Sequence, residues 1–477
     1  MKFSLVNAGP NIGLDERERR KALSSFPPLG ILYLATVLQQ NGVEVSALDQ
    51  AAKGYTIEET VKWIEKEDSD ILGFSTFSAS GRTAALISEK VKEKNPNITI
   101  IFGNYYATFN PERILRKYPS VDIIVRGEGE NTTIELLDYL KKGDDLRKVR
   151  GITFRSKDNS IVSAPERPLI KDLDSLPFPD RKLVDEEYHC IIAGANVAPK
   201  KFTSVVSSRG CVYRCRFCSC TQFARNIWRP RSVKNTMDEL HFLASEGYEQ
   251  FIFTDDSFTL DPKRVTELCR AMRKERLDMD WICEGRVDNC SYEILLEMAK
   301  AGCKILFFGI ESANQRILNY YNKKVTPEQS KTAVKTARKA GIDVIVGSFI
   351  VGAPDETKEE VQNTINFAKK IPIDIPQFNI LGVYPGTDLW DEFESKGLLK
   401  GDECWETGIA VSDICPTALP LNVIKLMIHD AFYEFFRRPS YILKQIMGTL
   451  KSSYRMGVVI SNLSRIEEIR QSLRSVA

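Results

Sequence analysis

The chain has 477 residues, of which 43% are hydrophobic and 27% are charged. This composition is typical of globular proteins and excludes a disordered chain, and the length suggests about three domains. Lys and Arg total 66 and Asp and Glu total 64, so the formal net charge is +2. A charge this balanced gives no sign of a nucleic-acid-binding protein.

Cysteines are unusually frequent compared with histidines, at eleven against three. The first residues show no signal-peptide pattern, and no apolar run of about 18 residues predicts a transmembrane segment. We therefore expect a cytoplasmic enzyme whose cysteines serve metal or redox chemistry before disulfides.

The first third of the chain alternates strand and helix patterns, which predicts an α/β fold with an open, doubly wound, Rossmann-like parallel sheet over residues 1–145. Ligands on such sheets lie beyond the carboxyl ends of the strands. The expected strands are 2–6, 43–48, 71–75, 98–102 and 122–125, and the expected helices are 29–40, 57–66, 83–94, 111–117 and 131–141.

Residues 146–200 are expected to form a linker that contains a hairpin. A second alternating series over 201–400 predicts a partial, open (β/α)6 barrel of the TIM type, with its chemistry at the carboxyl ends of the strands. Residues 401–477 are expected to be helical. The six barrel strands are expected near 202–207, 249–254, 280–283, 304–309, 343–350 and 376–381.

The sharpest motif is a Cys-x3-Cys-x2-Cys spacing formed by Cys211, Cys215 and Cys218, directly after the first expected barrel strand. Three thiolates on one loop can hold a 4Fe–4S cluster and leave the fourth iron open. A zinc site is the alternative, with Cys220 close enough to be a fourth ligand. Basic residues in the loop are expected to offset the thiolate charge: Arg209, Arg214 and Arg216.

This loop, including the aromatic Phe217 before the third cysteine, resembles the cluster-binding signature of radical S-adenosylmethionine (radical SAM) enzymes. The resemblance implies that the open iron chelates the amino and carboxylate groups of S-adenosylmethionine. An electron from the cluster then cleaves the sulfonium to give a 5′-deoxyadenosyl radical. The fold of that family, a partial barrel of six strand–helix units, agrees with the six units found here.

Segments at later strand ends resemble the same family, namely residues 253–258, 284–288, 309–312, 352–357 and 384–387. Each segment alone is weak, because a single acidic residue there is as often an ion-pair partner or a helix cap. The resemblance implies S-adenosylmethionine contacts at Phe217, Asp255, Arg286, Glu311 and Ser312.

The first domain resembles the cobalamin-binding domains that are fused to radical SAM barrels, through residues 27–30, 73–76, 103–108 and 126–130. Glycines at these strand ends permit close approach to a flat corrinoid, and hydroxyl groups can meet its nucleotide tail. The expected cobalamin contacts are Ser75, Thr76, Phe77, Ser78, Gly103, Tyr105, Glu128 and Gly129.

Histidine is absent from residues 1–150, because the three histidines are His189, His241 and His429. We therefore expect no protein histidine on cobalt, and we expect the lower face of the corrin to meet the loop near Phe77 and Ser78. Asn104 and Tyr105 stand where the family often has glycine and histidine. The alternative is a domain that holds no cobalamin and serves as a lid.

Together these features predict a cobalamin-dependent radical SAM methyltransferase, similar to class B, that methylates an unactivated carbon. The resemblance implies hydrogen abstraction by the 5′-deoxyadenosyl radical and methyl transfer from methylcobalamin. One alternative is carbon–carbon coupling or ring formation on a lipid or tetrapyrrole without methyl transfer, and another is a non-catalytic zinc- or cluster-binding protein. The substrate stays open between a natural product, a lipid, a tetrapyrrole and a protein residue, and an electron donor such as ferredoxin or flavodoxin is expected.

The other cysteines are interpreted mainly as buried, inert thiols: Cys269, Cys283, Cys290 and Cys303. Cys404 and Cys415 could bind an auxiliary cluster only if Cys190 or Cys220 joined them. The aromatic residues of the tail are interpreted as a helical cap on the barrel, the alternative being a surface for a lipid or a protein substrate.

Overall fold

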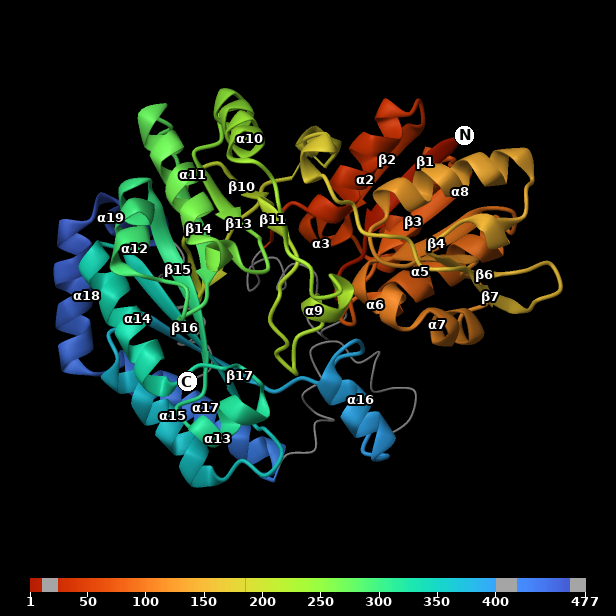
Figure 1. The fold of residues 1–477 in the computed structure, drawn as a ribbon. Coiled ribbons are helices and arrows are strands. Elements are labelled where there is room, and N and C mark those ends of the chain that lie inside the picture. The colour runs from red at the N-terminus through yellow and green to blue at the C-terminus, as the bar shows by residue number, and fades with distance from the viewer. Residues whose placement is uncertain (11–24, 185, 400–417, 464–477) are drawn as a thin grey trace.

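The computed structural model describes residues 1–10, 25–184, 186–399 and 418–463. It contains a seven-stranded sheet and a six-stranded sheet, each covered by helices, with the first in the N-terminal part of the chain and the second in the part that follows (Figure 1). This arrangement confirms the expected α/β architecture of a Rossmann-like domain followed by a partial barrel.

The seven-stranded sheet has the order β2-β1-β3-β4-β5-β6-β7 and is parallel from β2 to β5. Its central strands β3, β4 and β5 are nearly continuous apolar runs, as expected for a sheet buried on both faces, whereas the edge strand β2 is half polar. The parallel strands are β1 (Lys2–Asn7), β2 (Glu44–Asp49), β3 (Ile71–Ser75), β4 (Thr99–Gly103) and β5 (Ile123–Val125).

Helices cover both faces of this sheet, as in other doubly wound folds. The helices α2 and α8 pack on one face, and α4, α5 and α7 contribute to the core on the other. The helices of this domain are α2 (Leu29–Gln40), α3 (Gln50–Lys53), α4 (Ile57–Glu67), α5 (Gly81–Lys94), α6 (Asn104–Phe109), α7 (Pro111–Lys117) and α8 (Glu130–Lys142).

Two local features differ from the sequence expectation. The hairpin of β6 (Ile152–Arg155) and β7 (Ile161–Ser163) pairs antiparallel with β5 and so extends the first sheet, because Ile152 and Phe154 are buried in that domain's core. A short helix, α6, follows β4 directly at residues where no helix was expected.

The six-stranded sheet is parallel throughout, with the order β10-β13-β14-β15-β16-β17. It confirms the six expected barrel strands. Their bounds are β10 (Phe202–Val205), β13 (Gln250–Phe253), β14 (Asp280–Gly285), β15 (Cys303–Glu311), β16 (Val344–Val351) and β17 (Ile375–Ile380). The surrounding helices are α10 (Val233–Ser245), α11 (Pro262–Lys274), α12 (Tyr292–Lys300), α13 (Gln315–Tyr320), α14 (Pro327–Ala340), α15 (Lys358–Lys370) and α16 (Asp388–Ser395).

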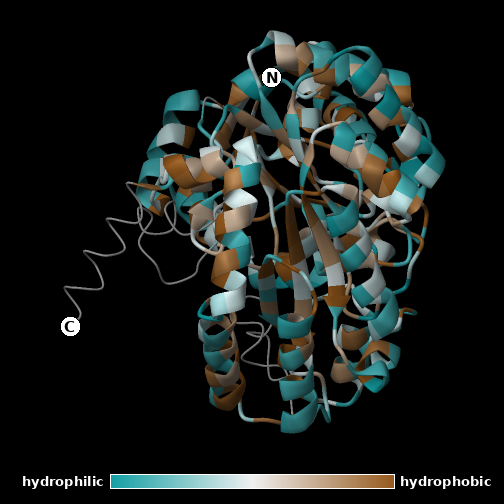
Figure 2. Cartoon of the chain, turned by 90° about the vertical axis from the view of Figure 1, so that its left-hand side faces the viewer, coloured by the Kyte–Doolittle hydropathy of each residue, from teal (hydrophilic) through white to brown (hydrophobic). Residues whose placement is uncertain are grey.

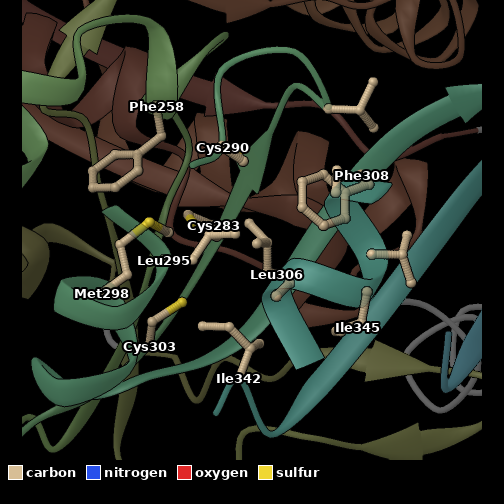
Figure 3. Close-up of a cluster of buried hydrophobic side chains, with 14 of the residues drawn as sticks. Phe258, Cys283, Cys290, Leu295, Met298, Cys303, Leu306, Phe308, Ile342 and Ile345 are labelled. Atoms are coloured by element: carbon tan, nitrogen blue, oxygen red, sulfur yellow. The ribbon is translucent and has the colours of Figure 1, made fainter. Parts of the chain in front are cut away.

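Side chains of the barrel strands alternate between two apolar clusters. Those that face outward join the helices in the largest core, which contains Cys283, Cys290 and Cys303 (Figure 3). Burial raises the pKa of the Cys290 thiol to about 12, and Cys269 lies in the same core. The expectation of buried thiols is therefore confirmed for these four residues, whereas Cys404 and Cys415 lie outside the described residues.

The inward-facing side chains at the amino ends of the strands form a smaller cluster with Ile282, Ile305 and Tyr454, which closes that end of the barrel. Tyr454 comes from the last of three C-terminal helices, α17 (Leu421–Phe436), α18 (Pro439–Lys451) and α19 (Ser453–Ser461). Phe435 of α17 is buried against the barrel, as expected for a helical cap. Within the described residues, no helix is both long enough and apolar enough to span a membrane.

Candidate active site

A cavity of about 270 Å³ lies between the two domains, where the carboxyl ends of β3, β4 and β5 face the first turns of the barrel. The first domain contributes glycine backbone to its wall, and the barrel contributes the loops after β10 and β13. Among the lining residues are Gly103, Gly127 and Gly129 from the first domain and Ser208, Gly210 and Asp256 from the barrel.

The wall made by the first domain suits a corrinoid. A Cβ atom added to Gly103 or Gly129 would meet no heavy atom closer than 3.8 Å, and neither residue has a positive φ. A side chain at either position would be accommodated without a clash, and both glycines line the cavity, while Phe3, Leu5 and Phe74 supply an apolar lining. A flat ring can approach the backbone edge closely, and an aromatic base can enter the apolar part.

Five of the eight residues expected to contact cobalamin line this cavity: Ser75, Gly103, Tyr105, Glu128 and Gly129. Phe77 and Ser78 line a second cavity of about 420 Å³, which also contains Cys218 and Cys220 of the cysteine loop. The loop after β3 therefore faces the cysteine loop across this second cavity. Tyr105 lines both cavities.

Two of the expected contacts have their polar groups occupied within the protein. The Thr76 hydroxyl is buried and donates to the carbonyl oxygen of Gly103 at 2.8 Å, so it joins β3 to β4 rather than facing the cavity. The Glu128 carboxylate accepts from Arg209 at 3.1 Å and from Arg229 at 3.0 Å. Burial opposes ionisation of Glu128, but the two arginines outweigh it and lower its pKa, so Glu128 joins the two domains.

Tyr105 stands at the centre of an aromatic stack between the domains. Its ring lies 4.3 Å from that of Phe223 in α9 (Cys220–Phe223) and 6.0 Å from that of Phe77, both nearly parallel. Offset stacking of this kind stabilises contacts by about 1 kcal/mol beyond burial. Tyr105 therefore fixes the cysteine loop against the first domain, and sequence reasoning missed this role.

The cysteine loop begins at a position that only glycine can occupy. Gly210 has a φ of +91°, and a Cβ atom there would lie 2.1 Å from the carbonyl oxygen of Ile227. Its amide donates to the Asp256 carboxylate at 2.8 Å. Further along, the amide of Cys218 donates to the carbonyl of Cys215 at 3.0 Å, which turns the loop between the second and third cysteines.

The cations beside the thiols are not the arginines expected from the sequence. Arg286 Nη1 lies 3.8 Å from the Cys215 sulfur, and the charges of Lys323 and Arg286 oppose the rise that burial causes in the pKa of Cys215. The three loop arginines pair elsewhere: Arg209 with Glu128 and Glu130, Arg214 with Asn226, and Arg216 with Glu392. Arg209 and Arg216 thus pair with carboxylates from distant segments, and the contribution of the three arginines to the thiolates stays a prediction.

The three cysteines nevertheless suit an iron–sulfur cluster. They lie half-buried on one loop, and the hydrogen bond from Cys220 lowers the pKa of Cys218 to about 7, which favours a thiolate. Among the described residues, no three His, Cys, Asp or Glu side chains are arranged to hold a single metal ion. In a 4Fe–4S cluster each thiolate binds a different iron.

Adjacent aspartates after β13 have opposite surroundings. The Asp255 carboxylate is buried and accepts from the Ser207 amide, the Ser207 hydroxyl and the Ser208 hydroxyl at 2.6–2.7 Å. Asp256 is exposed and lines the interdomain cavity. The structure thus places Asp256, rather than the expected Asp255, where an ammonium group could reach it.

Glu311 and Ser312, the two contacts expected at the end of β15, also have different surroundings. Glu311 accepts from Lys323 Nζ at 2.6 Å, with both side chains buried, and its backbone has a φ of +64°, which is strained for a residue with a Cβ atom. Ser312 is fully buried, and its hydroxyl contacts Thr364 and Asn314 instead of the barrel interior. Phe217 packs edge-on against Tyr321 and lines the second cavity.

Glu284 is a site residue that the sequence reasoning did not assign. In the same strand, Cys283 lies in the outer cluster and Ile282 in the inner one. Because side chains alternate along a strand, Glu284 points to the same side as Ile282, into the barrel interior. Glu284 is exposed to the barrel interior, where partial desolvation and the charges of Glu311 and Asp256 raise its pKa. The signals available in the sequence were one charged residue at the end of an apolar strand pattern and its place in the segment 284–288.

The comparisons with known proteins agree with this geometry. The model of the radical SAM superfamily matches residues 205–368, and the model of the B12 binding domain matches residues 19–137. An uncharacterized methyltransferase of Pyrococcus horikoshii is 36% identical over 90% of this chain and 92% of its own length. The anaerobic magnesium-protoporphyrin IX monomethyl ester cyclase of Rubrivivax gelatinosus is 30% identical over 91% of this chain and 80% of its own length.

Solved structures share the fold. One is the cobalamin-dependent S-adenosylmethionine radical enzyme OxsB with aqua-cobalamin and S-adenosylmethionine bound. It superposes on this chain with a TM-score of 0.71 at 18% sequence identity, and the match covers 100% of this chain and 80% of the OxsB chain. Another is the radical S-adenosylmethionine methyltransferase TsrM of Kitasatospora setae with cobalamin and a 4Fe–4S cluster bound. Its TM-score is 0.67 at 17% sequence identity, and the match covers 84% of this chain and 76% of the TsrM chain.

The chain therefore belongs to the radical SAM superfamily, among the enzymes that carry a B12 binding domain ahead of the radical SAM domain. The cofactors that accompany this pair of domains are the three predicted from the sequence, a 4Fe–4S cluster, S-adenosylmethionine and cobalamin. Membership in an enzyme family also removes the alternative of a non-catalytic zinc-binding protein.

Proposed function

We propose that this protein is a cobalamin-dependent radical SAM methyltransferase that transfers a methyl group to an unactivated carbon of its substrate. The observation that carries the proposal is the shared cavity, which is bordered by the glycine-lined strand ends of the first domain and by the start of the cysteine loop. When bound, the cluster supplies the electron that cleaves S-adenosylmethionine, and the corrinoid supplies a methyl carrier.

The residues of the chain hold and orient these groups. We assign the cluster to Cys211, Cys215 and Cys218, with Arg286 and Lys323 beside Cys215 to compensate its negative charge. We assign Asp256, which lines the cavity, to the ammonium group of S-adenosylmethionine, and Asp255 positions the turn before the loop through Ser207 and Ser208. Gly103 and Gly129 are assigned to the corrinoid wall.

The names of several relatives support methyl transfer. Besides the methyltransferase of Pyrococcus horikoshii, relatives include the cytidylyl-2-hydroxyethylphosphonate methyltransferase of Streptomyces wedmorensis, which is 28% identical over 79% of this chain. A carbon without a lone pair cannot attack a sulfonium directly, so its methylation needs radical chemistry together with a separate methyl carrier. The two domains provide one site for each.

Ring formation without methyl transfer is the second candidate, because the Rubrivivax gelatinosus cyclase is 30% identical to this chain. The two candidates differ in their use of S-adenosylmethionine. Methyl transfer leaves S-adenosylhomocysteine in addition to 5′-deoxyadenosine, whereas radical cleavage alone leaves 5′-deoxyadenosine and methionine.

The test uses the full chain, reconstituted without oxygen with iron, sulfide and hydroxocobalamin and then given S-adenosylmethionine and titanium(III) citrate. We expect both S-adenosylhomocysteine and 5′-deoxyadenosine, and we expect omission of cobalamin to remove only the S-adenosylhomocysteine. Formation of 5′-deoxyadenosine alone by the cobalamin-loaded protein would contradict methyl transfer and favour the cyclase candidate.

A further inference from the structure

The C-terminal helix α18 carries its apolar side chains on the outside of the molecule. Five large apolar residues of this helix are between 46% and 72% exposed: Ile442, Leu443, Ile446, Met447 and Leu450. Their spacing of i, i+1, i+4, i+5 and i+8 places all of them on one face of the helix. An apolar stripe of this kind normally faces the core of a protein.

The polar face of α18 is the one that packs on the barrel. Gln445 donates to the Asp374 carboxylate at 3.0 Å, and the Tyr441 hydroxyl donates to the Asp374 carbonyl at 2.9 Å. Arg455 of α19 bonds both Gln445 and Asp374. These buried polar bonds fix the rotation of α18, so its apolar face is held outward by the structure itself.

The next helix extends the apolar face. α19 packs against α18, and its exposed apolar residues Val459 and Ile460 are followed by Leu463. Tyr454 and Asn462 anchor this helix by hydrogen bonds to Val197 and Asn196. Figure 2 looks onto the side of the molecule that carries both helices and shows hydrophobic segments on helices of that side. We call the eight exposed apolar residues of α18, α19 and position 463 the α18–α19 face.

The charged residues of the segment that carries this face have one sign. Residues 437–463 contain five basic residues and no Asp or Glu, the five being Arg437, Arg438, Lys444, Lys451 and Arg455. Lys444, Lys451 and Arg437 are exposed, whereas Arg438 and Arg455 bond to the barrel. Two copies of this face would bring like charges together, which disfavours self-association, whereas an anionic surface would complement them.

We propose that the α18–α19 face docks the protein onto a membrane surface that contains anionic lipids. The apolar residues would enter the boundary between headgroups and acyl chains, and Lys444, Lys451 and Arg437 would lie at the level of the lipid phosphates. The helices pack beside Asp343 and Asp374, at the amino ends of β16 and β17. Docking therefore leaves the interdomain cavity, at the opposite ends of the barrel strands, uncovered.

The test is co-sedimentation of the full chain with vesicles of phosphatidylcholine alone and of phosphatidylcholine mixed with phosphatidylglycerol. We expect binding to the anionic vesicles that weakens as salt is added. The variant L443E/L450E should abolish binding, and K444E/K451E should weaken it by roughly tenfold or more, since each basic residue near the surface contributes about 1 kcal/mol. The matched control is Phe242→Glu, which adds a charge at an exposed apolar residue of α10 and should bind like the wild type.

Circular dichroism and 5′-deoxyadenosine formation show whether each variant is folded. A folded L443E/L450E variant that binds as tightly as the wild type would overturn the proposal, as would equal binding of the wild type to neutral and anionic vesicles. A wild-type dimer that L443E/L450E dissociates, without vesicle binding by either protein, would assign the face to self-association instead. None of these outcomes depends on methyl transfer.

Discussion

Buried carboxylates at the two ends of the barrel have pKa values that are shifted in opposite directions. At the amino ends of the strands, Asp374 is held by Arg338, by Arg455 at 2.9 Å and by the Ile345 amide at 2.7 Å. Burial opposes its ionisation, but the two arginines outweigh burial and lower its pKa. At the carboxyl ends, burial raises the pKa of Asp255 and Glu356.

This difference separates stability from function. The closed end of the barrel satisfies its charges internally. The open end has one such internal pair, Glu311 with Lys323, and also keeps carboxylates that its own cations do not fully compensate. Perturbed pKa values of that kind gather at functional sites, since ligands supply the missing charges there. Changes at the two ends should therefore have different consequences, which the following variants test.

The largest effect is expected at the open end. Replacing Cys211, Cys215 and Cys218 together with Ala should abolish both the iron–sulfur absorbance and 5′-deoxyadenosine formation, because no protein ligand to iron is left. The melting temperature should change little in comparison with the protein freed of its cluster. The control is Cys220→Ala, which should keep the cluster, and loss of the cluster in that variant would show a four-cysteine site.

Breaking the closed end should cost stability instead. Asp374→Asn leaves Arg338 and Arg455 buried without their counter-charge, which should lower the free energy of unfolding by about 3 kcal/mol. Denaturant melts would measure this loss. The control is Asp280→Asn, because its partners Lys200 and Lys304 lie nearer the surface. This variant should lose under about 1 kcal/mol of unfolding free energy. Loss of cluster content in folded Asp374→Asn protein would contradict the separation of the two ends.

Glu356 should make the open end sensitive to pH. Burial raises its pKa to about 7, although the amides of Gly352 and Ala353 donate to it. The folded state then binds the proton more tightly than the unfolded state, so its contribution to stability is lost as the pH rises from about 4.5 through about 7. Glu356→Gln should therefore stabilise the protein at pH 8 by roughly 2 kcal/mol and have little effect at pH 5.

The neighbouring Glu360 provides the control for this pH dependence. The hydrogen bond from Arg316 lowers the pKa of Glu360, so Glu360→Gln should not stabilise the protein at pH 8. Melting temperatures of both variants across this pH range measure the difference. Equal pH profiles for the wild type and Glu356→Gln would contradict the raised pKa.

The smallest expected effect distinguishes the adjacent aspartates. Asp256→Asn should weaken S-adenosylmethionine binding by about tenfold, since a charge-assisted hydrogen bond contributes roughly 1.5 kcal/mol or more. It should lower the melting temperature less than Asp255→Asn does, because an amide oxygen at this position can still accept from the single Gly210 amide. Asp255→Asn should lower the melting temperature, because it disturbs the bonds from Ser207 and Ser208. Equilibrium dialysis and thermal melts on both variants would show this, and the reverse assignment would contradict it.

Local sequence periodicity predicted the elements well, because it reports burial directly. The bounds of α2, α7 and β3 agree to the residue, and all six barrel strands were found. The cysteine loop was visible for the same reason, since its spacing is local. The partners of charged side chains were not predictable, because they depend on segments far apart in the chain, as for Arg286 beside Cys215 and Arg209 beside Glu128.

The orientation of residues just past a strand end was equally hidden from the sequence. The alternation of a strand stops at Phe253, so nothing local decides which of Asp255 and Asp256 faces the cavity. The antiparallel addition of the β6–β7 hairpin to the first sheet likewise depends on tertiary burial of Ile152 and Phe154 rather than on the hairpin's own pattern.

The central claim is that a corrinoid binds at the glycine-lined wall of the interdomain cavity. Its most direct test is the amount of cobalamin that the anaerobically loaded protein keeps after gel filtration, measured by absorbance for the wild type and for Gly129→Leu. We expect about one cobalamin per chain for the wild type, and a large loss in the variant, because Gly129 lines the cavity and the larger side chain would occupy part of it. A wild type that keeps no cobalamin, or a folded Gly129→Leu variant that keeps as much as the wild type, would contradict it.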